Sequence, residues 1–169
     1  LWLLKLGAKV TGFSDEIPTK PSLFEDAKLD SKITHIFGDI RDFDHIYRVI
    51  NELRPDFIFH LAAQAIVSTS YLNPHKTMGT NFIGTVNVME SIRLTNHNCS
   101  AVIVTSDKCY ENVEWIWGYK ETDQLGGKDV YSSSKGAAEI AFHGYFNSFF
   151  NKPNSNIKIA TGRAGNVIG

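Results

Sequence analysis

Short apolar runs alternate along the chain with longer stretches of helical periodicity. Five runs rich in Val, Ile and Phe predict strands at 9–14, 33–40, 56–63, 101–107 and 157–164. The stretches between them predict helices at 1–7, 43–53, 81–95 and about 131–150. This alternation predicts an α/β fold with a doubly wound, Rossmann-like parallel sheet. Because the strands are apolar almost throughout, we expect helices on both faces of that sheet.

The carboxyl ends of the strands are where such a sheet binds its ligands. Here the ends carry polar residues, at 13–15, 39–41, 60–64, 106–108 and 163–166. Two connections, 15–32 and 108–130, are long for a compact domain, so at least one of them is expected to serve a site. Functional residues are therefore sought at the strand ends and in these connections.

Composition narrows the class of partner. The 169 residues are 43% hydrophobic and 21% charged, as in one soluble globular domain. A net charge of -1 offers no basic stripe for nucleic acid, and the apolar start "LWLLKLGAKV" is too short for a signal peptide or membrane span. Cys99 and Cys109 lack the paired spacing of a metal site, so no metal is expected. We expect a cytoplasmic protein with a small ligand.

The stretch "YSSSK" places Tyr131 and Lys135 four residues apart, on one face of a helix. A nearby ammonium group lowers the pKa of a phenol, so Tyr131 could take a proton from a substrate hydroxyl. Ser106, at the end of a strand, could hydrogen-bond the same substrate oxygen. Each motif alone is weak, because taken singly a helix-surface pair and a turn-capping serine are the better explanations. Their order and spacing are much rarer than either part.

Together with "HLAAQ" (60–64), "TNFIGT" (80–85) and "GDIRD" (38–42), these residues resemble the extended short-chain dehydrogenase/reductase family over essentially the whole chain. The resemblance implies a bound NAD and a catalytic triad of Ser106, Tyr131 and Lys135. It also implies a group of cofactor-binding residues, which are Asp39, Ile40, Ala62, Ala63, Asn81, Tyr131 and Lys135. Without the family, Asn81 is equally well a helix cap and Asp39 a turn residue.

Asp107 and Lys108 follow Ser106 directly, and an acid next to a base is what a dehydratase adds to such a triad. The stretch from Thr105 to Glu139, with its "WIWGY" and "LGG", resembles the CDP-glucose 4,6-dehydratase subfamily. Many sugar-nucleotide dehydratases carry Asp-Glu here, so Lys108 departs from that pattern and leaves the base that removes the C5 proton open. The alternative is a surface ion pair between Asp107 and Lys108, worth roughly 0 to 1 kcal/mol.

The resemblance implies conversion of CDP-glucose to CDP-4-keto-6-deoxyglucose by a homo-oligomeric bacterial lyase that serves polysaccharide biosynthesis. An epimerase or another dehydratase of the superfamily, or a non-catalytic dinucleotide sensor, stays open. NADP also stays open as the cofactor. Asp15 would favour NAD by binding the ribose hydroxyls, but the sequence does not fix its alignment to that position. Gln64 and Asn166 are candidate substrate contacts. The chain (1–169) is expected to be part of an NAD-binding domain, without the first strand, the Gly-rich turn and the C-terminal substrate domain, and to bind no NAD alone.

Overall fold

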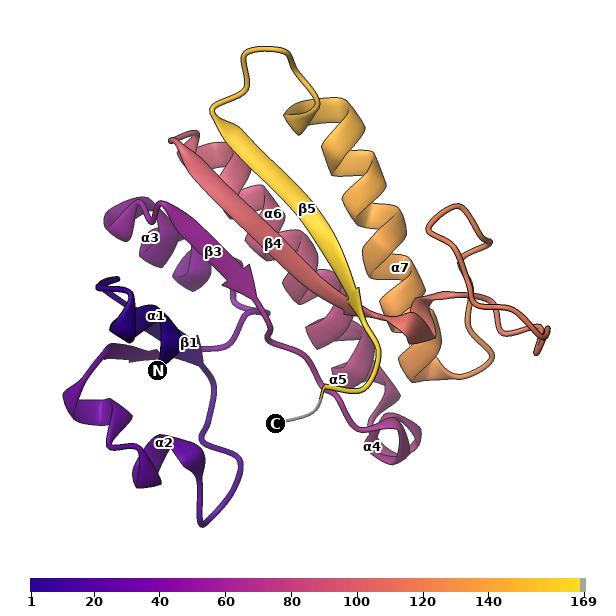
Figure 1. Ribbon diagram of the computed structural model, residues 1–169, viewed down its shortest axis with the longest axis horizontal. Coiled ribbons are helices and arrows are strands. Elements are labelled where there is room, and N and C mark those ends of the chain that lie inside the picture. Colours follow the sequence, from indigo (N-terminus) through magenta and orange to yellow (C-terminus); the bar gives the residue numbers. More distant parts are fainter. Residues whose placement is uncertain (168–169) are drawn as a thin grey trace.

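The computed structural model describes residues 1–167, which form two parallel sheets (Figure 1). Strands β1 (Thr11–Ser14) and β2 (Thr34–Phe37) pair in one sheet. The second sheet has the order β3 (Phe57–His60), β4 (Cys99–Ser106), β5 (Ile157–Ala164). The predicted α/β fold with parallel strands is confirmed. Residues 168 and 169 lie outside the described part.

Three helices, α3 (Phe43–Leu53), α6 (Gly84–Thr95) and α7 (Val130–Tyr145), lie along one face of the β3–β4–β5 sheet (Figure 1). The core forms between them and the strands, where Met89, Ile92 and Ile103 are fully buried. Burial of such side chains is the main force that holds helices to a sheet. None of the helices in residues 1–167 is long and apolar enough to cross a membrane.

The shorter elements lie in the connections. They are α1 (Trp2–Lys5), α2 (Leu23–Asp26), α4 (Val67–Leu72), α5 (Pro74–Met78), the 3-10 turns Leu29–Ser31 and Asp107–Cys109, and the π-helical turns Gly79–Ile83 and Phe146–Phe150. The long connection at 15–32 thus contains α2 and the turn Leu29–Ser31. The helix expected at 81–95 begins only at Gly84, because the preceding turn is π-helical.

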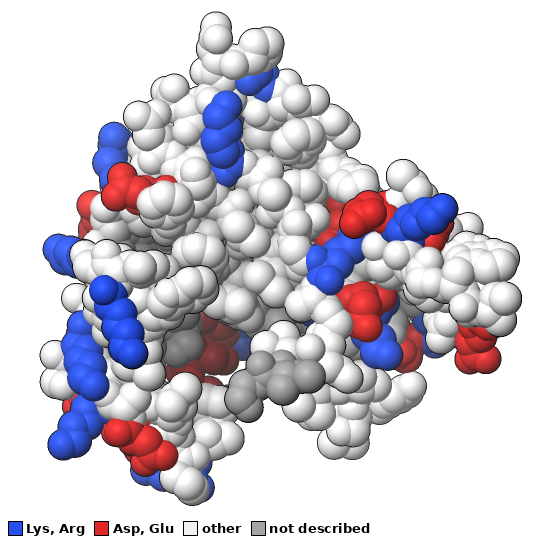
Figure 2. Space-filling model, in the orientation of Figure 1, with Lys and Arg blue, Asp and Glu red and all other residues white. Residues whose placement is uncertain are grey.

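The expectation that helices cover both faces of the strands was wrong for β3. Its residues alternate, with His60 buried against the helices and Phe57 and Phe59 exposed on the opposite face by 68% and 48%. In Figure 2 the middle of the visible face is almost free of charge, and acidic and basic side chains mix around its margin. An apolar strand therefore does not by itself show that both of its faces are covered.

Candidate active site

Ser106 ends strand β4 opposite Ala164 of β5 and starts the 3-10 turn Asp107–Cys109. Its Oγ accepts a hydrogen bond from the backbone N–H of Lys108 at 3.2 Å and donates one to Asp107 Oδ1 at 3.0 Å. Ser106 is thus a turn-capping residue and also a hydroxyl at the carboxyl edge of the sheet. The turn-capping interpretation is confirmed, and the hydrogen bond of Ser106 to a substrate oxygen stays a prediction.

Helix α7 carries Tyr131 and Lys135 to the same edge. Asp129 caps the helix, since its carboxylate accepts from the Ser132 backbone N–H at 2.9 Å and from Ser132 Oγ at 2.7 Å. Tyr131 and Lys135 are 8% and 6% exposed, and Lys135 Nζ lies 5.9 Å from the centre of the Tyr131 ring. The i, i+4 pair predicted from the sequence is therefore a buried pair and not a surface one.

Burial raises the pKa of Tyr131, and the neighbouring Ser106 hydroxyl opposes this by lowering it. The prediction that Lys135 lowers the pKa of Tyr131 was wrong for the protein without ligands, because burial dominates there. Burial also lowers the pKa of Lys135, which has no hydrogen-bond partner within residues 1–167. A buried amine of this kind suits an acceptor supplied by a ligand.

Asp107 and Lys108 are exposed and form no ion pair within the described residues. The surface-pair alternative is therefore wrong. Both line a pocket of about 360 Å³ next to the start of α7, together with Val67, Tyr110, Asn112, Tyr119, Gly127, Lys128, Asp129 and Ser132. The acid and the base are thus not paired with each other, and both face a pocket beside Ser106.

Asn81 connects the loop after β3 to helix α7. It is 1% exposed, its Oδ1 accepts from the Gln64 backbone N–H at 2.8 Å, and its Nδ2 donates to the Gln64 carbonyl at 3.0 Å and to Ser134 Oγ at 2.9 Å. The Gln64 side chain is also used internally, because it donates to Thr77 Oγ1 and accepts from the Ile66 backbone N–H. Both residues shape the site, and their contacts with cofactor or substrate stay predictions.

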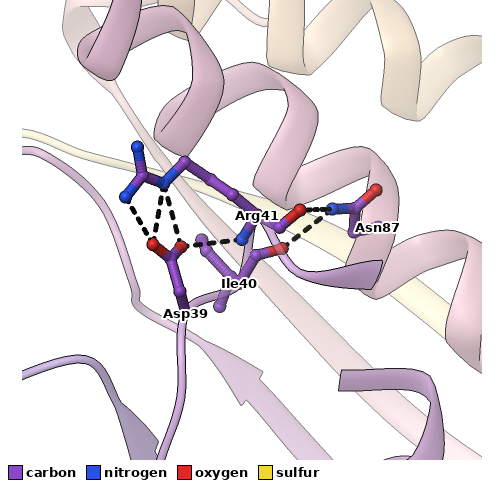
Figure 3. A network of polar contacts seen from close by, with 4 residues as sticks. All are labelled: Asp39, Ile40, Arg41 and Asn87. Atoms are coloured by element: carbon purple, nitrogen blue, oxygen red, sulfur yellow. Dashed lines mark hydrogen bonds and ion pairs between the residues drawn. The ribbon is translucent and has the colours of Figure 1, made fainter. Parts of the chain in front are cut away.

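Figure 3 shows the hydrogen bonds that hold the turn after β2, which consists of Asp39, Ile40 and Arg41. The Asp39 carboxylate accepts from the Arg41 backbone N–H at 2.8 Å and from the Arg41 guanidinium, which lowers the pKa of Asp39. Asn87 of α6 donates from Nδ2 to the carbonyls of Ile40 and Arg41 at 2.9 and 3.2 Å. This turn is therefore rigid, with Asp39 partly neutralised by Arg41.

The remaining predicted residues lie at the same carboxyl edge. Ala62 and Ala63 follow β3 and are half-buried, and Asn166 is exposed two residues beyond the Ser106–Ala164 strand pair. Sequence reasoning missed four residues that hold the site in place, Arg41, Asn87, Ser134 and Glu139. Arg41, inside "GDIRD", and Ser134, inside "YSSSK", lie in stretches that the sequence singled out, so both could have been identified.

Solved structures with the same fold are sugar-nucleotide enzymes. A UDP-glucose 4-epimerase from Thermotoga maritima, solved with UDP-glucose, superimposes with a TM-score of 0.79 at 21% identity over 96% of this chain and 49% of that one. The UDP-glucose 4-epimerase of Thermus thermophilus, solved with NAD, gives 0.77 at 24% identity over 95% and 48%. At these identities the likeness shows the fold alone.

Sequence comparison shows the family. A CDP-glucose 4,6-dehydratase from Salmonella typhimurium is 45% identical over 100% of this chain and 48% of its own length, so the chain spans about half of that relative. The family model described as GDP-mannose 4,6 dehydratase matches residues 2–160. The chain therefore belongs to this family of sugar-nucleotide dehydratases within the extended short-chain dehydrogenases/reductases.

Proposed function

We propose that the whole protein containing this chain converts CDP-glucose to CDP-4-keto-6-deoxyglucose with NAD as a bound cofactor. The observation that carries the proposal is an acid and a base that form no ion pair, Asp107 and Lys108, in one pocket beside Ser106. An oxidoreductase or epimerase needs no such pair, whereas a dehydratase must remove one proton and supply another. The 45% identity to a CDP-glucose 4,6-dehydratase supports the choice of substrate.

Each residue has a distinct task in this reaction. Tyr131 Oη takes the proton of the sugar 4-hydroxyl, and Ser106 Oγ hydrogen-bonds the same oxygen. The resulting 4-ketone makes the C5 proton acidic. Lys108 Nζ is the group that would accept that proton, while the Asp107 carboxyl group would protonate the departing 6-hydroxyl. Water leaves, the hydride taken from C4 would be returned to C6, and the proton held by Lys108 would be returned to C5, so the sugar undergoes no net oxidation or reduction.

The edge of the sheet suits a dinucleotide. Lys135, a buried residue whose Nζ has no hydrogen-bond partner within residues 1–167, would hold the ribose, and Asp39, Ile40, Ala62 and Ala63 would line the adenosine half. When bound, NAD would supply the hydride acceptor for C4 and the hydride donor for C6, and its oxidised nicotinamide ring would bring a positive charge to the site. That charge would oppose the effect of burial on the pKa of Tyr131.

Product mass tests the substrate. The whole protein is incubated separately with CDP-glucose, dTDP-glucose, UDP-glucose and GDP-mannose, and each product is weighed by mass spectrometry. We expect the mass of one water to be lost from CDP-glucose. Loss of water from a different sugar nucleotide would show that the substrate proposed here is wrong. A product of unchanged mass with altered stereochemistry would identify an epimerase. No reaction with any of the four would favour a dinucleotide sensor. The cytoplasmic location, the homo-oligomeric state and the role in bacterial polysaccharide synthesis belong to the same proposal.

A further inference from the structure

A buried ion pair lies directly behind the Ser106–Cys109 segment. Glu139, one helical turn after Lys135 on α7, is fully buried, and its Oε2 accepts from Arg163 Nη2 of β5 at 2.8 Å. The hydroxyl of Thr105 donates to Oε1, and that of Thr161 to Oε2 at 3.4 Å. The carboxylate is therefore fully engaged, as a charge removed from water requires.

The pair holds the segment at both of its ends. Thr105, which donates to Glu139, directly precedes Ser106. On the other side Arg163 Nη1 donates to Tyr110 Oη at 2.9 Å, and Tyr110 directly follows Cys109. The same Nη1 donates to the Glu121 carbonyl at 3.0 Å. One guanidinium thus connects strand β5, helix α7 and the long loop that follows the turn.

Packing leaves the segment little other freedom. A Cβ atom on Gly136 of α7 would lie 3.3 Å from the Cys109 carbonyl and 3.0 Å from the Gly126 carbonyl, so helix and loop are in close contact there. Asp107 and Arg163 also line a shared pocket of about 520 Å³. A displacement of Arg163 would therefore alter the surroundings of Asp107, the proposed acid.

We propose that the Glu139–Arg163 pair is a positioning clamp, which fixes the Ser106–Cys109 segment relative to Tyr131 for the dehydration. This inference rests on the proposed function. The rival explanation is an ordinary buried pair that contributes to stability alone. The two differ in whether loss of the pair loosens the segment locally and slows catalysis in protein that is still folded.

The test uses the whole protein with Glu139→Gln and Arg163→Met combined, so that no unpaired charge is left buried. The matched control is Glu90→Gln with Arg93→Met, which removes the partly exposed bidentate pair of α6, away from the site. Arg163→Lys keeps the charge but loses the planar fork that reaches Glu139 and Tyr110 together. Thermal unfolding establishes that each variant is folded.

The labelling rates of two buried thiols measure whether the Ser106–Cys109 segment loosens, independently of any assay of activity. Cys109 lies in the segment and Cys99 at the opposite end of β4, and burial raises the pKa of each to about 11. Labelling of either thiol therefore requires the protein to open. We expect the double variant to label Cys109 about tenfold faster relative to Cys99, measured by peptide mass mapping. Equal acceleration of both thiols, or of neither, would overturn the clamp.

Kinetics complete the test. With the clamp lost, kcat for dehydration should fall by up to about 100-fold with little change in KM, because the reacting groups are misplaced. The kcat of Arg163→Lys should fall as that of the double variant does. The α6 control should keep the kcat of the parent. Parental kcat in a folded variant with a loosened Cys109 would also overturn the inference. A parent that dehydrates no sugar nucleotide would overturn the proposed function, while the labelling result still decides the local clamp.

Discussion

Lys108 and Lys135 are both close to the proposed reaction but have different surroundings. Lys135 is 6% exposed, and burial lowers its pKa, whereas Lys108 is open to solvent in the pocket it shares with Asp107. A buried amine suits a fixed contact with a ligand, and an exposed one can move to meet a substrate. This difference supports a binding role for Lys135, whereas the proton-transfer role proposed for Lys108 rests on its place beside Asp107 in the pocket and not on burial.

Replacing Lys108 with Ala should separate the two halves of the reaction in the whole protein. Ketone formation depends on Ser106, Tyr131 and Lys135 and should continue, so reduced cofactor should accumulate, as seen by its absorbance. Loss of water should fall by about 100-fold or more, since general base catalysis contributes this much. Lys152→Ala, on an exposed residue beyond α7, is the control. Parental water loss by the Lys108 variant would exclude Lys108 as the base.

Because His60 is buried, we expect the folded protein to lose stability in acid. Thr85 Oγ1 donates to the Asn81 carbonyl and lies 3.0 Å from His60 Nε2, so Nε2 is assigned as the protonated nitrogen of a neutral ring. Burial, with a smaller effect of Lys135, lowers the pKa of His60 from 6.5 to about 4. Between these values the unfolded state binds the proton and the folded state does not, so stability falls as the pH falls.

The loss associated with His60 should approach about 3 kcal/mol by pH 4, judged from the size of the shift. Urea unfolding of the whole protein at several pH values measures it. His60→Gln, which can still donate to Thr85 but does not titrate, should be less sensitive over this window. Equal acid sensitivity of the parent and the variant would contradict the assignment.

The residues at strand ends could be predicted from the sequence because the position of a strand end is set by the apolar pattern. Ser106, Asp107 and Lys108 were found in this way, and Tyr131 and Lys135 by their spacing. Glu139 and Asn87 could not be found. Each is a polar residue on a helix whose partners are 24 and 47 residues away in sequence, and no local pattern encodes that contact.

At the scale of elements, the start of α7 has the least room for change. A Cβ on Gly127 would lie 2.3 Å from the Ser133 nitrogen and 2.5 Å from the Ser132 carbonyl carbon, both of them backbone atoms. Gly144, in the same helix, faces open space. The "LGG" stretch is therefore required by the close approach of the loop to the first turn of the helix that carries Tyr131.

Gly127→Ala should destabilise the whole protein by about 1 to 3 kcal/mol, because backbone atoms must move to accept the methyl group. Gly144→Ala should instead stabilise it by about 0.5 to 1 kcal/mol, since alanine loses less chain entropy in a helix. Urea unfolding compares the two variants. A neutral Gly127→Ala would show that the loop does not press on α7 as described.

Element boundaries followed the apolar pattern where one face is buried. The predicted helix 43–53 and strand 157–164 match α3 and β5. The pattern failed at 81–83, where the backbone widens into a π-helical turn around Asn81. Such a turn keeps helical periodicity in the sequence while altering the hydrogen bonds, and it is often found at functional sites. The deviation from regular helix thus coincides with a residue that organises the site.

At the scale of the molecule, parallel strands bring distant segments to one edge. Residues from β3, β4, α7 and the end of β5 meet there, although the chain between the first and last of them exceeds a hundred residues. The fold class was predictable because βα alternation admits few arrangements. The exposed face of β3 was not, since the sequence of a strand does not specify what packs against it. That the chain alone binds no NAD stays a prediction.

One measurement tests the central claim most directly. The whole protein is given CDP-glucose labelled with deuterium at C4, and the product is examined by mass spectrometry and NMR. We predict a product lighter by one water that retains the deuterium, now at C6, because hydride leaves C4 and returns to the carbon that lost its hydroxyl. Deuterium still at C4 in a product of unchanged mass, or lost to solvent, would contradict the proposed dehydration.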